Sequence, residues 1–118
     1  MSSKNRYRHG ADLPMVSRSA LVLEPTAAYW EWANSCPGDD PKVPPPGLGQ
    51  EDESTVYLIP QMDLGPESWL RRHFAAILEH ELWAWCTDTT FWPADRSFDA
   101  FNRFFNVRFC SMVLDMGR

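Results

Sequence analysis

Stretches rich in apolar residues mark three short segments of the chain and predict β-strands. The segments are ALVLEP at residues 20–25, TVYLIP at residues 55–60 and VRFCSMVLDM at residues 107–116. Consecutive apolar residues, as opposed to alternating ones, are typical of strands that are covered on both faces. The pattern therefore predicts three strands, of which the first two are buried.

The stretches between these strands have the periodicity of helices. Residues 27–35 follow Thr26, whose hydroxyl is expected to cap the first turn. Residues 67–86 form the longest predicted helix, and residues 98–105, after the capping residue Ser97, repeat phenylalanine on one face. Helices between strands commonly act as crossovers between parallel neighbours. We therefore predict an α+β fold of order β-α-β-α-α-β, with a three-stranded, at least partly parallel sheet and about three helices packed on it.

Polar and proline-rich stretches divide the chain into a tail and one domain. Residues 1–18 have no sustained period and are predicted to be a mobile basic tail, whereas residues 19–118 are predicted to be a single globular domain. A proline-rich loop at residues 37–54 is expected to be an extended connection inside that domain. Its segment 41–46 has the PxxP spacing of a ligand for an aromatic groove, although a plain linker is the commoner role of such a sequence.

Composition and charge narrow the classes of protein. The 118 residues are 44% hydrophobic, which is enough for a core, and the formal net charge of −5 argues against a nucleic-acid binder. The tail carries a charge of +3 and the remainder −8. No apolar run reaches the ~20 residues of a membrane span, and the N-terminus lacks a signal peptide. Three cysteines without CxxC spacing predict neither a disulfide framework nor a zinc site, so we expect a soluble cytoplasmic protein without a cofactor.

One acid interrupts the apolar face of the longest predicted helix. When Leu70 is set at zero on a helical wheel, Glu81 projects at about 20°, in the middle of the apolar arc. A carboxylate in that position has to be paired, reach solvent or hold its proton. Two interpretations stay open: a general acid, base or metal ligand with a perturbed pKa, or an ion pair with Arg96, Arg103 or Arg108.

Other acids and histidines complete the candidates for chemistry. His80 and Asp88 lie close to Glu81 in the sequence, so the three are the candidate catalytic group of a small metal-assisted hydrolase. A second arrangement, for a hard cation such as Mg²⁺, needs parallel strands, because acids at the strand ends would then meet at one edge of the sheet. These acids are Glu24, Asp63 and Asp115. No HExxH, GxGxxG, GxxxxGK[ST] or GxSxG motif is present.

The tryptophans of residues 81–98 are candidates for binding a partner. Trp83 projects at about 220°, on the polar face of the helix. Either the loop at residues 87–96 folds back over it, with Trp92 as a cover, or Trp83 is exposed as an anchor for a protein partner. Trp83 and Trp92 are therefore the candidate partner-binding residues, whereas Trp85 lies on the apolar arc and is expected to enter the core.

Four phrases of the chain together resemble a family of small, uncharacterised bacterial proteins. They are LVLEPTAAYWEW, TVYLIP, WCTDTTFWPADRSFDAF and SMVLDM, and the resemblance covers about residues 19–116. It implies a bacterial, cytoplasmic protein and carries over no activity and no site residues.

Together, these features of the sequence favour a small, non-enzymatic regulatory or protein-interaction domain, which binds a protein partner or a second copy of itself. The aromatic content and the proline-rich loop support this function, and no catalytic motif opposes it. The alternative is the metal-assisted hydrolase that uses a carboxylate and histidine cluster. The direction of the Glu81 carboxylate distinguishes the two, because a hydrolase needs it in a cleft beside a histidine.

Overall fold

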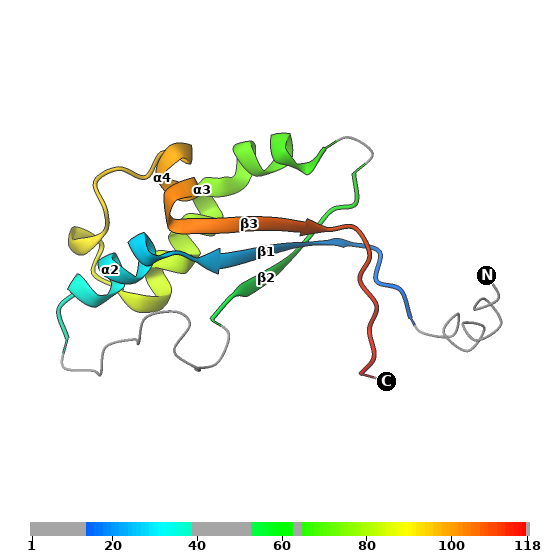
Figure 1. The fold of residues 1–118 in the computed structure, drawn as a ribbon, viewed down its shortest axis with the longest axis horizontal. Helices are drawn as coiled ribbons and strands as arrows, with labels where there is room; N and C mark the ends of the chain where they lie inside the picture. Colours follow the sequence, from blue (N-terminus) through cyan, green and yellow to red (C-terminus); the bar gives the residue numbers. More distant parts are fainter. Residues whose placement is uncertain (1–13, 39–52, 63–64, 118) are drawn as a thin grey trace.

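The computed structural model of the protein describes residues 14–38, 53–62 and 65–117 (Figure 1). Within these ranges the strands are β1 (Ser19–Pro25), β2 (Thr55–Ile59) and β3 (Phe105–Cys110). The helices are α2 (Ala27–Ser35), α3 (Pro66–Trp85) and α4 (Phe98–Phe104), with a short 3₁₀ helix, η1 (Thr89–Phe91), ahead of α4. The predicted α+β class, with three strands and three α-helices in these ranges, is confirmed.

The prediction of a partly parallel sheet is wrong. The strand order is β2-β1-β3, and the central strand β1 is antiparallel to both neighbours. The nine residues of α2 span only about 14 Å, less than the roughly 23 Å of the seven-residue β1, and β2 begins beside the end of β1. The twenty-residue α3, about 30 Å long, is a crossover between β2 and β3. Those two strands run in the same direction, but β1 lies between them.

The helices cover one face of the sheet, where the core lies. On this inner face the sheet buries Leu21, Leu23, Ile59 and Phe105. From α3 it receives Leu70, Ile77, Leu78 and Leu82. Phe101 of α4 is fully buried, and its ring centroid lies 5.3 Å from that of Phe105. Tyr29 of α2 reaches the same ring at 5.0 Å, so aromatic side chains join the sheet to two of the helices.

The opposite face of the sheet, here called the outer face, is open. Strand side chains alternate between the two faces, so Val22, Val56 and Leu58 point away from the core. Val56 and Leu58 are 59% and 57% exposed. The expectation that the strands are covered on both faces is therefore wrong for β2, and the described residues leave an apolar surface on this side.

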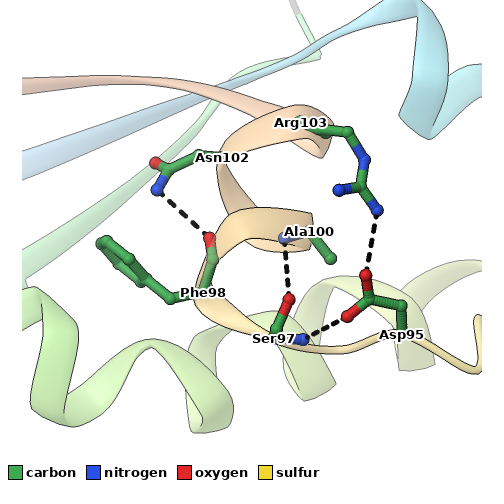
Figure 2. A network of polar contacts seen from close by, with 6 residues as sticks. All are labelled: Asp95, Ser97, Phe98, Ala100, Asn102 and Arg103. Carbon is green, nitrogen blue, oxygen red and sulfur yellow. Dashed lines mark hydrogen bonds and ion pairs between the residues drawn. The ribbon is translucent and has the colours of Figure 1, made fainter.

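Hydrogen bonds around Ser97 hold the turn into α4. Ser97 Oγ accepts from the Ala100 N–H at 3.2 Å, which confirms the predicted cap (Figure 2). The Asp95 carboxylate accepts from the Ser97 N–H at 3.0 Å and pairs with Arg103 at 3.3 Å. The predicted cap at Thr26 is wrong, since its hydroxyl donates to the Arg103 carbonyl at 2.5 Å. That bond joins the start of α2 to the end of α4.

Short segments before β1 and after β3 lie side by side beyond the sheet (Figure 1). They form an isolated antiparallel bridge between Met15 and Leu114. The third strand, predicted over residues 107–116, is thus the shorter β3 followed by this bridge. Residues 1–13 of the predicted tail, and residues 39–52 of the proline-rich loop with its PxxP segment, lie outside the described residues. No helix in the described part of the chain combines the length and the apolar character that a membrane span requires.

Candidate functional site

Tyr57 of β2 and two neighbouring residues of α3, Glu81 and His80, form a hydrogen-bonded group. The Tyr57 hydroxyl donates to Glu81 Oε2 and lies 2.9 Å from His80 Nδ1. Because the hydroxyl has one proton, both contacts are satisfied when its oxygen accepts from the Nδ1–H of His80. The Glu81 side chain is 6% exposed, whereas His80 is exposed. The Glu81 carboxylate is therefore shielded from solvent and hydrogen-bonded to Tyr57, whereas the His80 imidazole lies at the surface.

Two tyrosines adjoin Glu81, and both have pKa values above the usual range. Burial raises the pKa of Tyr57, and its hydrogen bond to Glu81 acts in the same direction. Burial also raises the pKa of Tyr29, followed by the negative charge of Glu81. The Tyr29 hydroxyl donates to the Glu81 carbonyl at 2.6 Å. Both phenols are therefore protonated hydrogen-bond donors at neutral pH. Through them, Tyr29 of α2 and Tyr57 of β2 are both bonded to Glu81 of α3.

Glu81 is thus paired with a tyrosine and not with the predicted arginine. Arg103 is instead paired with Asp95 at 3.3 Å. Arg96 donates to the Pro93 carbonyl at 2.7 Å, and Arg108 lies on β3. A phenol replaces the guanidinium because the fold brings Tyr57 to Glu81 across 24 residues of chain. A buried carboxylate needs a donor, and a neutral donor meets that need without burying a second charge.

The predicted catalytic group of Glu81, His80 and Asp88 is brought together only in part. Asp88 accepts from the Thr90 N–H at 3.0 Å and from the Thr90 hydroxyl at 2.7 Å, within the turn of η1. These bonds lower the pKa of the Asp88 carboxyl. Across residues 14–38, 53–62 and 65–117, no three His, Cys, Asp or Glu side chains are grouped to hold a metal ion. The hydrolase alternative stays a prediction.

The acids at the strand ends were predicted to meet at one edge of a parallel sheet, and the structure does not bring them together there. Glu24 lies at the end of β1, where its register partner on β3 is Asn106. Asp115 lies near the start of β1, because its N–H donates to the Pro14 carbonyl at 2.8 Å. The antiparallel sheet places these two acids at opposite ends of β1, and Asp63 lies outside the described residues. This arrangement therefore offers no shared cation site.

A surface depression on α3, here called the tryptophan hollow, contains both predicted partner-binding residues. Its volume is about 330 Å³. Its lining residues are Ala76, Glu79, His80, Trp83 and Trp92. Trp83 keeps 55% of its surface exposed, so the loop does not cover it. Trp92 is held in place because its Nε1–H donates to the Cys86 carbonyl at 2.8 Å.

Trp85, which the helical pattern places in the core, is 41% exposed instead. It is the last residue of α3 and packs edge-on against Trp30 with ring centroids 5.8 Å apart. The wheel predicts the direction of a side chain but not whether another element lies there. Near the end of a helix the covering layer stops, and the apolar stripe continues into solvent.

Comparison of the chain with family models, with curated proteins and with solved structures found no match. The resemblance to a family of small bacterial proteins stays a prediction.

One feature of the sequence indicates that Tyr57 belongs to the buried site, although it lies within an apolar run. The side chains of a strand alternate, so Tyr57 and Ile59 must share a face, opposite to Val56 and Leu58. A phenol on an inner face needs a hydrogen-bond partner. Glu81 is the charged residue on the apolar arc of the long helix, and the half-buried phenol and the buried carboxylate satisfy one another.

We expect Tyr57→Phe to lower the free energy of unfolding by about 1–3 kcal/mol, because it leaves the buried Glu81 carboxylate without its donor. Urea unfolding followed by tryptophan fluorescence measures the loss. In a Glu81→Met background the carboxylate is gone, and the same change at Tyr57 should cost far less. Equal costs in the two backgrounds would show that the hydrogen bond contributes nothing.

Proposed function

We propose that the protein is a small, non-enzymatic interaction domain that binds a protein partner at the tryptophan hollow. The observation that carries the proposal is the exposure of Trp83 beside Trp92 in a depression of about 330 Å³. Tryptophan is enriched among the residues that contribute most to protein interfaces, and it is costly to leave in water. The volume is near the lower end of the range for ligand pockets, which suits one or two side chains of a partner.

The rigidity of the hollow supports the proposal. Four of its lining residues lie on the well-packed α3, and the indole N–H of Trp92 is fixed on the Cys86 carbonyl. A preformed surface loses little conformational entropy when a partner binds. The Tyr57, Glu81 and His80 group does not favour catalysis, since its carboxylate is closed off and its phenol is held protonated.

The outer face of the sheet is a second exposed apolar surface, and it includes Val56 and Leu58 of the edge strand β2. Nothing in the described residues indicates what would cover it. A second copy of the chain is one partner that the following experiment includes, because self-association through the tryptophan hollow would also depend on Trp83.

Peptides selected from a displayed random library against the full chain should bind at the tryptophan hollow. We expect Trp83→Leu to weaken their binding by about thirtyfold, the effect of losing a central tryptophan from an interface. Trp85→Leu is the matched control, because Trp85 is also a half-exposed tryptophan of α3 but does not line the hollow. It should change binding by less than about threefold.

Circular dichroism and melting curves establish that both variants are folded, and size-exclusion chromatography with light scattering reports any self-association. Peptides that bind the two variants equally well would contradict the proposal. So would a library that yields no binding peptide and a chain that remains monomeric.

A further inference from the structure

We infer that the tryptophan hollow binds an arginine side chain of the partner, an inference about the ligand that rests on the proposed function. The hollow combines two indole rings with one carboxylate, and no lysine or arginine lines it. These features are the two kinds of group that recognise a guanidinium: an aromatic face for its plane and an anion for its N–H donors.

The charge of the hollow selects a cation. Glu79 lines the depression and is exposed at its surface, one turn of α3 from Trp83. The chain as a whole carries a formal net charge of −5, which attracts a basic segment over a longer distance. A neutral or acidic side chain would leave the Glu79 carboxylate without an added donor.

The aromatic rings favour a planar cation. Two aromatic rings of the chain, one of them Trp92 of the hollow, already receive guanidinium groups from the chain itself. The Arg96 Cζ atom lies 5.8 Å from the centroid of the Trp92 ring, and the Arg71 Cζ atom lies 4.4 Å from that of Phe98. Indole binds cations more strongly than phenyl, and Trp83 has more than half its surface free to do so.

Arginine fits the hollow better than lysine does. A guanidinium can stack on an indole face and, in the same plane, direct N–H groups toward a carboxylate at the rim. An ammonium is more strongly hydrated and points its donors in three directions, so stacking and pairing compete. The hollow is also open to solvent on one side, where a weakly hydrated cation loses less on binding.

The test uses three small probes that differ only in the end of the side chain: N-acetylarginine amide, N-acetylcitrulline amide and N-acetyllysine amide. Citrulline carries a neutral urea in place of the guanidinium, with nearly the same shape. Each probe is titrated into the full chain while the indole N–H resonances are followed by NMR, and Trp83→Leu assigns the resonance of Trp83. We expect arginine to shift the Trp83 and Trp92 resonances, and citrulline to bind about tenfold more weakly. Lysine should bind about threefold more weakly than arginine.

Two matched variants test the part played by the carboxylate. Glu79→Gln should weaken arginine binding by about threefold to fivefold, and added salt should reduce that difference. Glu67→Gln, which removes an exposed acid of the same helix outside the hollow, should leave binding unchanged. Equal binding of citrulline and arginine, tighter binding of lysine, or no shift of the two indole resonances would each overturn the inference.

The two experiments distinguish a failure of the inference about arginine from a failure of the proposed function. Trp83-dependent peptides that contain no arginine would overturn the inference and leave the proposed function intact. Arginine binding by the small probe, in a chain that selects no peptide and does not self-associate, would support the ligand class and contradict a protein-interaction role.

Discussion

Replacing Phe101 with alanine is expected to lower the free energy of unfolding by about 3–5 kcal/mol. The side chain is fully buried, and its ring lies between those of Phe74, Phe98 and Phe105, with centroids 5.9, 6.1 and 5.3 Å away. Its removal loses the transfer free energy of a phenyl ring and leaves a cavity where α3, α4 and β3 meet. Domains of this size are stable by roughly 5–15 kcal/mol, so the variant should lose at least about a fifth of its stability.

Urea unfolding, followed by the fluorescence of the six tryptophans, measures this loss. Phe91→Ala is the control, because it makes the same chemical change at a side chain that is 46% exposed, in η1. Burial of about half a phenyl ring predicts a loss of roughly 1 kcal/mol there. A similar loss at both positions would mean that the contact of α4 with the sheet is not the centre of the core.

Alkaline pH is expected to destabilise the protein through Tyr29 and Tyr57. Both phenols have pKa values raised above the usual value, which is about 10 and applies in the unfolded chain. The folded state therefore keeps protons that the unfolded state has already released, and the free energy of unfolding falls as the pH rises. Their contribution is fully present below about pH 10 and is lost as the pH rises toward the folded-state pKa values.

The expected slope is large. Tyr29 is 1% exposed, so it should contribute nearly the limiting value of about 1.4 kcal/mol per pH unit, or about 2–3 kcal/mol between about pH 10 and pH 12. Tyr57 is only half-buried and should add less. Unfolding midpoints in urea at about pH 8, 10 and 11 measure the slope.

Single variants separate the two tyrosines. Tyr29→Phe should remove most of the slope and Tyr57→Phe the smaller part, whereas the wild-type chain retains both. Ultraviolet difference absorbance reports the tyrosinates directly. If Tyr29 and Tyr57 ionise near pH 10 while the chain is still folded, the burial of these hydroxyls is not as the structure describes.

The local parts of the fold were predictable from the sequence. The limits of α2, residues 27–35, agree with the prediction. Those of α3 differ from it by one residue at each end, and α4 begins as predicted and ends one residue earlier. The positions of β1 and β2 were also recognised, as was the cap at Ser97. These features depend on side-chain periodicity and capping within a few residues, which the sequence displays directly.

The candidate site was predictable only as a set of residues. The projection of Glu81 into the apolar arc was enough to expect a buried carboxylate with a partner, and it is 6% exposed. Its partner was not predictable, because Tyr57 and three arginines were all able to donate. The exposure of Trp83 was one of two open alternatives, and Trp92 reaches the same hollow only through the path of the loop that follows α3.

The sequence by itself determined which segments are helices and strands, where the apolar stripe of α3 runs and which acid interrupts it. Only the tertiary structure decided the direction of the strands, the partner of Glu81, the openness of the outer face and the exposure of Trp85. The physical reason is the range of the forces involved. Periodicity and capping act over a few residues, whereas strand pairing and burial depend on which distant segment the chain brings alongside. The placement of β1 between two strands of the same direction is such a long-range choice.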